Sequence, residues 1–298
     1  MNLKPKIIIV AGPTASGKSD LAVKIARKYN GEIISADSRQ VYKDLNIGTG
    51  KITKKEMLGI KHYLLDVENP KNKFTAENFR EMGEKAIEKI IKDKKIPIIC
   101  GGTGFYIEAL ISRENFPNVP PNEKLRKELE KKTLDKLLKI LETLDKRRFE
   151  NIDKQNKRRI IRAIEIAKTL GKVPETNLDD SKYETLWIGT TWPNEIFKER
   201  IHTRLLKRLK MGMLNEAKKL HKKGLSWKRM EELGLEYRYM ARHLQGKISK
   251  EEMISELEKE IWHYAKRQMT WFKRNQKINW FKPTEIKKID GLVKKFLG

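Results

Sequence analysis

Short runs of apolar residues alternate with amphipathic segments over the first hundred positions of the chain. The apolar runs lie at 6–11, from 31 up to a polar cluster at 37–42, at 62–67 and at 95–100. Between them, 20–26 and 74–94 carry apolar residues three and four positions apart, which is the spacing of amphipathic helices. Buried strands that alternate with helices of this length form parallel, doubly wound sheets, so the pattern predicts an α/β fold.

The pattern changes after this region. Pro117, Pro120 and Pro121 break the chain, and 122–170 is helical in composition without a strand signal. A run at 182–191 predicts a strand that returns to the sheet, and the chain is helical again from Glu195. We therefore expect an α/β core at 1–126 completed by a strand at 184–194, a helical insertion at 127–183, and a helical C-terminal part at 195–298 packed on the core.

The net charge points toward a polyanionic partner. The chain carries 66 Lys and Arg against 40 Asp and Glu, a formal net charge of +26, and 195–298 contributes more than half of the excess. A long polyanion such as RNA or DNA is the natural partner for such an excess. A lysine-rich surface with many Lys–Glu pairs in helices is the alternative, so charge alone leaves both interpretations open.

Targeting and redox features indicate the cytoplasm. The sequence has no apolar run of about eighteen residues and no signal-peptide pattern before its first strand, so we expect no membrane span and no secretion. The single cysteine, Cys100, excludes an internal disulfide and a cysteine-rich zinc site. Its place in an apolar strand indicates core packing.

The first predicted strand leads into Gly-Pro-Thr-Ala-Ser-Gly-Lys-Ser at 12–19. Gly12 and Gly17, followed by Lys18 and Ser19 between a strand and a helix, form the P-loop pattern, whose backbone amides and helix N-terminus cradle phosphates. Lys18 would neutralise phosphate charge and Ser19 would hold Mg2+. The sequence therefore predicts a polyphosphate or diphosphate site and not a Gly-x-Gly-x-x-Gly dinucleotide site.

Acidic residues follow the second and third predicted strands. Because the carboxyl ends of parallel strands face the ligand crevice, Asp37 and Ser38 are expected beside the bound phosphates, where a carboxylate can accept a proton from a nucleophile. A turn or a helix N-cap is the alternative role for Asp37. Asp66 is expected to be a turn residue, with metal assistance through water as the alternative, and His62 has no partner histidine for a zinc site.

Two predicted helices carry arginines on one face. Arg158, Arg159 and Arg162 lie on one side of a helix that has isoleucines on the other, and this face suits either RNA or solvent. Arginines at 200, 204 and 208 recur every four residues and so line one face, which suits phosphates.

Aromatic and cationic residues interleave at 262–274, near the C-terminus. Such interleaving suits base stacking and backbone contact with unpaired nucleotides. Core packing of the aromatic residues under a solvated basic rim is an equal alternative.

Several motifs together resemble the tRNA dimethylallyltransferase (isopentenyl-tRNA transferase) family. They are the P-loop at 12–19, Ser-Ala-Asp-Ser-Arg-Gln-Val-Tyr at 35–42, Asn-Ile-Gly-Thr-Gly-Lys at 46–51, His-Tyr-Leu-Leu-Asp-Val at 62–67, Gly-Gly-Thr-Gly-Phe-Tyr at 101–106, Arg-Arg-Ile-Ile-Arg-Ala-Ile-Glu at 158–165 and Arg-Gln-Met-Thr-Trp-Phe-Lys-Arg at 267–274. The P-loop alone is generic, but its conjunction with the motifs at 35–42 and 101–106 is specific. The resemblance runs nearly end to end.

The resemblance implies a reaction on tRNA. A dimethylallyl group would pass from dimethylallyl diphosphate to N6 of the adenosine at tRNA position 37, beside the anticodon, with release of diphosphate. The adenine would be flipped from the anticodon stem-loop into a channel, and the insertion at 127–183 would close over the stem as a lid. We expect a monomer with Mg2+ as cofactor, and tRNA and dimethylallyl diphosphate as partners.

The resemblance also implies site residues by motif position. Asp37 would be the base, Thr14 would lie near the reacting centre, and Lys18 and Arg204 would meet the departing diphosphate. The diphosphate would be bound by Gly12, Pro13, Thr14, Ala15, Ser16, Gly17, Lys18 and Ser19, with Mg2+ on Ser19. The tRNA would be bound by Asp37, Ser38, Arg39, Gln40, Thr103, Arg126, Arg158, Arg159, Ile160, Ile161 and Arg162.

Two alternatives from other classes share parts of this site. A P-loop small-molecule or nucleotide kinase would use Lys18, Ser19 and Asp37 to transfer the γ-phosphate of ATP, and it would need no RNA. An RNA-binding NTPase would release phosphate when RNA binds, but the sequence lacks a clear Walker B acid pair.

Overall fold

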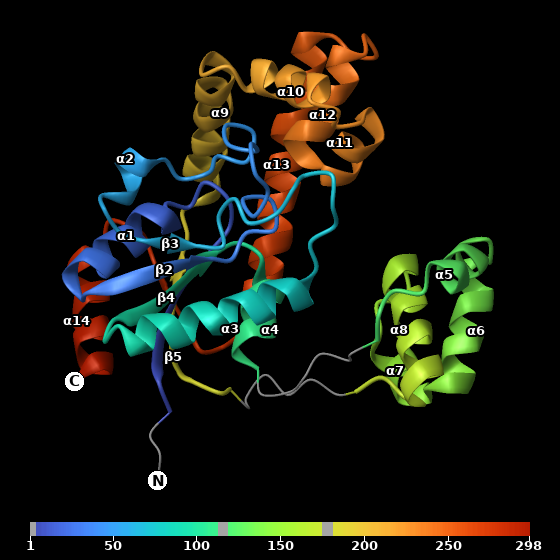
Figure 1. Ribbon diagram of the computed structural model, residues 1–298, viewed down its shortest axis with the longest axis horizontal. Helices are drawn as coiled ribbons and strands as arrows, with labels where there is room; N and C mark the ends of the chain where they lie inside the picture. The colour runs from blue at the N-terminus through green and yellow to red at the C-terminus, as the bar shows by residue number, and fades with distance from the viewer. Residues whose placement is uncertain (1–3, 113–118, 175–180) are drawn as a thin grey trace. The chain divides into compact units, whose positions relative to one another are not determined.

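The computed structural model describes residues 4–112, 119–174 and 181–298. The chain divides into two compact units. The core unit comprises Met1–Ile111 and Ser181–Gly298, and the inserted unit comprises Ser112–Asp180. Figure 1 shows the chain by residue number. Among the described residues, no helix is long and apolar enough to cross a membrane.

The core unit is built on one parallel sheet. Its strands are β1 (Lys6–Ala11), β2 (Gly31–Ser35), β3 (His62–Tyr63), β4 (Ile96–Gly101), β5 (Glu184–Thr190) and β6 (Ile278–Phe281), in the order β3-β2-β4-β1-β5-β6. The register pairs Ile8 of β1 with Ile98 of β4 and Leu186 of β5. The predicted α/β fold is confirmed. The sequence pattern did not predict β6, which pairs in parallel with β5 at the edge of the sheet.

Helices cover both faces of this sheet because successive residues of a strand point to opposite sides. Ile7 and Ile9 of β1 pack in one buried cluster with helices α3 (Ala76–Lys92) and α4 (Gly104–Ile111). Ile8 and Val10 pack in a second cluster with α1 (Lys18–Lys28) and α14 (Ile286–Leu297). The strand ends are thereby fixed, and the loops that follow them meet at one edge of the sheet.

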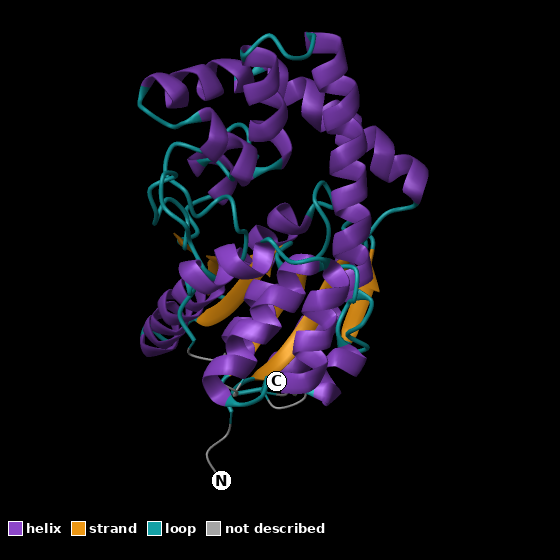
Figure 2. Ribbon diagram, turned by 90° about the vertical axis from the view of Figure 1, so that its right-hand side faces the viewer, coloured by secondary structure: helices purple, strands orange, loops and turns teal. Residues whose placement is uncertain are grey.

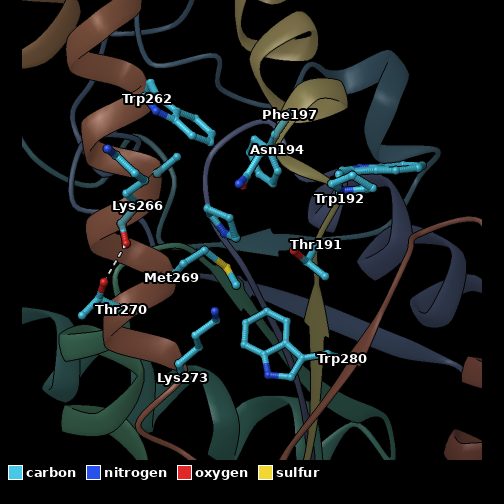
Figure 3. Close-up of a pocket in the computed structure, with 13 residues that line it drawn as sticks. Thr191, Trp192, Asn194, Phe197, Trp262, Lys266, Met269, Thr270, Lys273 and Trp280 are labelled. Atoms are coloured by element: carbon cyan, nitrogen blue, oxygen red, sulfur yellow. Dashed lines mark hydrogen bonds between the residues drawn. The ribbon is translucent and has the colours of Figure 1, made fainter.

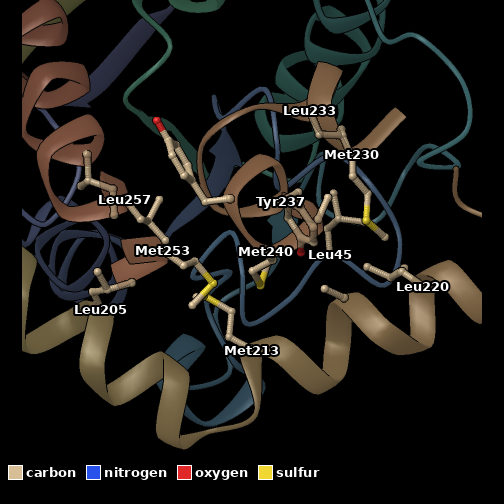
Figure 4. Close-up of a cluster of buried hydrophobic side chains, with 14 of the residues drawn as sticks. Leu45, Leu205, Met213, Leu220, Met230, Leu233, Tyr237, Met240, Met253 and Leu257 are labelled. Carbon is tan, nitrogen blue, oxygen red and sulfur yellow. The ribbon is translucent and has the colours of Figure 1, made fainter. Parts of the chain in front are cut away.

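A third buried cluster lies beyond those loops. It is formed by α9 (Asn194–Lys210), α10 (Met213–Lys222), α11 (Trp227–Leu233), α12 (Leu235–Leu244) and α13 (Lys250–Phe272). Figure 2 shows these helices gathered at the end of the sheet, and Figure 4 shows the Met, Leu and Tyr side chains that fill the space between them. Ala15 of the P-loop and Val41 belong to the same cluster, so the loops pack against these helices. The short helix α2 (Lys54–Met57) lies in the loop region.

The inserted unit is helical throughout its described secondary structure. Its helices are α5 (Glu123–Glu130), α6 (Leu134–Leu144), α7 (Lys146–Asn151) and α8 (Lys157–Leu170). Each follows an Asn, Thr or Asp whose side chain accepts a backbone N–H of the first turn, which fixes where the helix begins. The unit starts before the expected boundary at 127, because α5 packs on α8 around one buried cluster.

Candidate active site

The P-loop conformation is set by two glycines and a buried hydroxyl pair. Gly12 has φ 153° and Gly17, which caps α1, has φ 92°, both in the region that favours glycine. A Cβ on Gly12 would lie 2.5 Å from Oγ1 of Thr190, at the end of β5. The Ser16 and Thr190 hydroxyls are hydrogen-bonded at 2.6 Å. The loop is therefore held against β5. The backbone amides that follow it lie at the N-terminus of α1, where they can bind an anion.

Lys18 is the cationic residue of the P-loop motif and lies in the first turn of α1. Its Nζ donates to the Pro13 carbonyl at 3.1 Å, so the side chain folds back over the loop. Burial lowers the pKa of Lys18, with nearby Cys100 and Asp37 opposing the shift and Arg204 adding to it. A partly desolvated ammonium beside an anion nest is suited to bind phosphate oxygens.

Ser19 fits a phosphate-bound Mg2+. The described residues contain no group of three or more His, Cys, Asp or Glu side chains that could hold a metal ion. Mg2+ needs no such cage when it takes most of its ligands from phosphate oxygens and water. Ser19 offers one hydroxyl in the first turn of α1.

Three arginines of α9 bind the loops around this site. They lie on one face of the helix, as their spacing of four residues predicted. Arg200 Nε donates to the Ala15 carbonyl at 2.9 Å. Arg204 donates to Thr14 Oγ1 at 3.4 Å and to the Gly50 carbonyl at 3.2 Å, and Arg208 donates to the Gly48 carbonyl at 2.7 Å. The guanidinium of Arg204 thus joins the P-loop to the glycine loop at 46–51.

The glycine loop at 46–51 is held by a carboxylate that sequence reasoning missed. Glu216 of α10 accepts the backbone N–H groups of Asn46, Ile47 and Gly48 at 2.7–3.0 Å. The Tyr237 hydroxyl donates to the same carboxylate at 2.7 Å. This loop therefore presents the Gly50 carbonyl to Arg204 in a fixed position.

Asp37 follows β2, on the same edge of the sheet as the P-loop. Its Oδ1 accepts the backbone N–H of Arg39 at 2.8 Å and of Gln40 at 3.2 Å, so Asp37 also caps a turn. In the part of the chain that the structure describes, Oδ2 has no hydrogen-bond partner. One oxygen of Asp37 thus fixes the loop and leaves the other to accept a proton.

Two side chains join the loops after β1, β2 and β4. Gln268 of α13 is buried, its Oε1 accepts the Thr14 N–H at 2.8 Å, and its Nε2 donates to the Gly102 carbonyl at 2.9 Å. Thr103 Oγ1 accepts the Ser38 N–H at 3.1 Å. A continuous chain of contacts therefore runs from the P-loop to the Asp37 loop.

A cavity of about 570 Å³ opens beside Pro13 of the P-loop. Figure 3 shows it between α9, α13 and the ends of β5 and β6. Trp192, Phe197, Trp262, Met269 and Trp280 supply apolar surface, and Lys266 and Lys273 lie on the same wall. The cavity therefore offers apolar surface and positive charge directly beside the phosphate-binding loop.

Asp66 helps to hold these loops, since its N–H donates to the Gln40 carbonyl at 3.3 Å, and His62 lies in β3. Asp66 accepts from Lys51 Nζ at 2.5 Å, and Lys51 also donates to the Tyr42 carbonyl at 2.8 Å. This ion pair and the positive φ of Asp66, 56°, match the expected turn role. His62 Nδ1 lies 2.9 Å from the Ile60 carbonyl, and burial lowers its pKa.

The remaining predicted tRNA contacts lie in the inserted unit, on α5 and α8. Arg158 and Arg159 are exposed. Ile160 and Ile161 are buried in the core of the unit, so their side chains pack there and not on its surface. Arg126 and Arg162 both bind Glu165, Arg126 with two hydrogen bonds of 3.0 and 2.8 Å.

Comparisons with known proteins identify the chain's relatives. A family model described as IPP transferase matches residues 40–275. The chain is similar to a tRNA dimethylallyltransferase 2 of Treponema denticola, with 43% identity over 286 residues that cover 93% of this chain and 96% of that protein. It is 40% identical to the tRNA dimethylallyltransferase of Pediococcus pentosaceus over 306 aligned positions, which cover 98% and 97% of the two chains. The chain belongs to the IPP transferase family.

Solved structures of the IPP transferase family share the fold. A tRNA isopentenylpyrophosphate transferase of Staphylococcus epidermidis has a TM-score of 0.73 and 35% identity, with 98% of this chain and 99% of that chain covered. A eukaryotic dimethylallyltransferase, described as acting on tRNA, has a TM-score of 0.82 and 27% identity, with 98% and 77% covered. The resemblance carried by the sequence motifs is confirmed.

Gln268 and Glu216 are the site residues of this IPP transferase that sequence reasoning missed. Gln268 carried a usable signal, because it lies three residues after Ala265 and four before Phe272, on the buried face of α13. A polar residue at a buried helical position needs a hydrogen-bond partner. Glu216 is polar on an amphipathic helix and carried no comparable signal.

Glu165 is expected to control the stability of the inserted unit. Burial alone would raise the pKa of Glu165, but hydrogen bonds from Arg126, the Asn122 N–H and Arg162 outweigh it and lower the pKa below 4.5. Glu165→Gln breaks a buried ion pair and should lower the free energy of unfolding of this unit by about 3 kcal/mol. Hydrogen exchange at the amides of α8 measures the loss.

The lowered pKa of Glu165 fixes the pH dependence of this stabilisation. The ionised Glu165 contributes fully to stability above its unfolded-state pKa, and this contribution is lost as pH falls through the folded-state pKa. The difference between wild type and Glu165→Gln should therefore shrink below pH 4.5, the ordinary value for glutamate. Glu142→Gln, which changes an exposed glutamate of α6, is the control, and equal exchange in all three proteins would contradict the prediction.

Proposed function

We propose that this protein transfers a dimethylallyl group from dimethylallyl diphosphate to N6 of the adenosine at tRNA position 37, releasing diphosphate. One observation carries the proposal: Gln268 and Thr103 join the phosphate-binding P-loop to the loop of Asp37. The site thereby holds an anion cradle and a candidate base side by side. The relatives named as tRNA dimethylallyltransferases support this reaction and give no support to a kinase.

Asp37 is the proposed base. The N6 nitrogen attacks the allylic carbon, the carbon–oxygen bond to diphosphate breaks, and its electron pair leaves with the diphosphate oxygen. The proton lost from N6 passes to the Asp37 carboxylate, whose Oδ2 is not used to hold the loop. An exocyclic adenine amine is a weak nucleophile, so positioning and this carboxylate supply much of the rate.

The departing diphosphate develops negative charge, which the P-loop side of the site is built to stabilise. The amides at the N-terminus of α1, the Lys18 ammonium and the Arg204 guanidinium would meet it, with Arg204 already held beside Thr14. Ser19 would hold Mg2+, which when bound neutralises diphosphate charge. Binding of diphosphate and of Mg2+ is thus assigned to residues 12–19.

We assign the cavity beside Pro13 to the donor. Its apolar walls suit a dimethylallyl chain, and Lys266 and Lys273 suit an anionic diphosphate that approaches the P-loop. Asp37 is not among the residues that line this cavity, so we propose that donor and acceptor reach the reacting centre from different sides, with Thr14 between them.

The tRNA is assigned to residues of both units. Asp37, Ser38, Arg39, Gln40 and Thr103 would hold the flipped base, with Thr103 fixing Ser38. The inserted unit would hold the anticodon stem through Arg158 and Arg159 and serve as a lid. We place the reaction in the cytoplasm. A monomer would carry it out, because one chain supplies every proposed group.

Arg158→Ala is expected to raise KM for tRNA several-fold and to reduce the salt dependence of binding. Removal of one phosphate contact releases about one counterion fewer, so the slope of log Kobs against log salt should become shallower by about one. Filter binding at several salt concentrations measures the slope. Lys139→Ala, on the exposed side of α6, is the matched control, and an unchanged slope in Arg158→Ala would exclude this contact.

The proposed reaction is tested directly by nucleoside mass spectrometry. The purified protein and Mg2+ are incubated with dimethylallyl diphosphate and an unmodified tRNA that carries adenines at positions 36 and 37. A gain of one prenyl unit on that adenosine, absent without the diphosphate, is expected. No gain, together with phosphate transfer from ATP to a small molecule, would replace the proposal with the kinase alternative.

A further inference from the structure

The side chain of Lys51, at the end of the glycine loop 46–51, joins three segments of the chain. It is only 5% exposed, although a lysine is seldom buried unless its charge is paired. Its Nζ lies 2.8 Å from the Tyr42 carbonyl, 3.0 Å from Asn46 Oδ1 and 2.5 Å from Asp66 Oδ1. An ammonium has three N–H donors, so each of them has an acceptor here. The reaction proposed above gives this fully bonded cation no role.

Two of these three segments are attached to the loop of the proposed base. Tyr42 lies five residues after Asp37 in the same loop. Asp66 is bonded to that loop as well, because its N–H donates to the Gln40 carbonyl at 3.3 Å. Lys51 therefore ties the end of the glycine loop to the segment that follows Asp37, both directly and through Asp66.

The peptide group between Gly50 and Lys51 is the point where this tie meets the site. The Lys51 N–H donates to the Asn46 carbonyl at 2.9 Å, which orients the peptide group. The Gly50 carbonyl accepts from Arg204 at 3.2 Å and from Gln40 Nε2 at 3.4 Å. A Cβ on Gly50 would lie 2.2 Å from the Arg204 guanidinium, so that group rests directly on this backbone. One carbonyl thus holds two side chains of the proposed site.

We infer that Lys51 is a positioning residue that acts on prenyl transfer through the Gly50 carbonyl. The inference rests on the proposed function, which assigns Arg204 to the diphosphate and Gln40 to the flipped base. Glu216 holds the other end of the glycine loop through three backbone N–H groups. Loss of the Lys51 ammonium therefore leaves the loop one anchor, and it should displace the carbonyl on which Arg204 rests.

Lys51→Met tests this role in the full chain, because it keeps the apolar stem and removes the ammonium. We expect kcat for transfer to a synthetic anticodon stem-loop to fall 10- to 100-fold, since small displacements of a catalytic group have effects of about this size. KM for the stem-loop should rise several-fold through Gln40. Lys223→Met is the matched control: it breaks a Lys–Asp pair of 3.0 Å between exposed side chains and should change neither value.

Asp66→Asn is a second variant that keeps the test valid if Lys51→Met folds poorly. The Asp66 side chain is half exposed, and asparagine tolerates its positive φ of 56°. The change replaces an ionised acceptor of Lys51 by a neutral one, so kcat should fall by a smaller factor than in Lys51→Met. A wild-type kcat in both folded variants would overturn the inference.

A double-mutant cycle separates positioning of Arg204 from a loss of stability. Arg204→Met removes the guanidinium that the Gly50 carbonyl holds. If Lys51 acts through Arg204, then Lys51→Met should lower the single-turnover rate little further in the Arg204→Met background. A general loss of folded protein would instead lower the rate by the same factor in both backgrounds, and that result would overturn the inference.

Binding of inorganic diphosphate with Mg2+ gives the same test without transfer. Calorimetric titration should show that Lys51→Met raises Kd for diphosphate several-fold in the wild-type background and little in Arg204→Met. A wild-type diphosphate Kd in Lys51→Met would overturn the inference even where transfer occurs. Failure of the wild type to prenylate any stem-loop would overturn the proposed function, and the diphosphate cycle would still report on Lys51.

Discussion

Replacement of Asp37 by asparagine is expected to lower kcat for prenyl transfer about 10³-fold while tRNA binding stays within a factor of a few of wild type. The asparagine Oδ1 can still accept the Arg39 and Gln40 N–H groups, so the loop keeps its turn. The amide that replaces Oδ2 cannot take the N6 proton. Single-turnover transfer to a stem-loop and filter binding measure the two quantities.

Comparison of two substitutions separates the two roles of Asp37. Asp37→Ala removes both the base and the turn contact, so it should abolish transfer and also weaken tRNA binding relative to Asp37→Asn. Asp44→Asn, which changes an exposed aspartate paired with Lys223, should leave both quantities unchanged. Full activity in Asp37→Asn would show that another group accepts the proton.

The sheet was predictable because its signal is local. Ile7, Ile8, Ile9 and Val10 form a continuous apolar run, as a strand buried on both faces requires, and the buried runs of β2, β4 and β5 repeat the pattern. The strand predicted at 62–67 is only His62–Tyr63 in the structure, and its two residues are half-buried. The pattern gave no sign of β6, Ile278–Phe281, whose four residues follow a long helix and are only partly buried. Its pairing with β5 joins residues about ninety positions apart, and no local pattern encodes that contact.

Positions in the site were predictable where one motif contains both the residue and its neighbour. Lys18 and Ser19 are such cases, because strand, loop and helix are continuous in sequence. Gln268 and Thr14 are 254 positions apart, and Glu216 binds a loop about 170 positions away. These contacts exist only in the folded chain, so the spacing around Gln268 could show that it needs a buried partner but not that the partners are Thr14 and Gly102, and nothing in the sequence singled out Glu216.

The same distant contacts explain why α9 and α13 matter to the chemistry. Arg204 joins Thr14 to Gly50, and Gln268 joins Thr14 to Gly102. Both helices therefore hold Thr14 of the P-loop, which we propose lies near the reacting centre. The helical C-terminal part, whose sequence suits either RNA contact or core packing with a solvated basic rim, thus also fixes the P-loop through Arg204 and Gln268.

Lys18→Met is expected to lower kcat 10²–10³-fold, because it removes a cation from a partly desolvated site where diphosphate develops charge. Binding of the stem-loop should be unchanged, since Lys18 is assigned to the diphosphate and not to the tRNA. Rapid-quench measurement of transfer, with tRNA at saturation, gives the rate. Lys24→Met, on the exposed side of the same helix, is the matched control.

The pH dependence of the donor reaction tests the charge of Lys18 itself. Burial lowers the pKa of Lys18 from 10.5, so its ammonium is complete at lower pH and is lost as pH rises through the shifted value. In wild type, kcat/KM for dimethylallyl diphosphate should therefore fall on the alkaline side below pH 10.5, and Lys18→Met should lack this decline. The Cys100 thiol cannot cause it, because burial raises the pKa of Cys100 to about 11. An identical alkaline decline in Lys18→Met would show that another group carries the charge that the diphosphate requires.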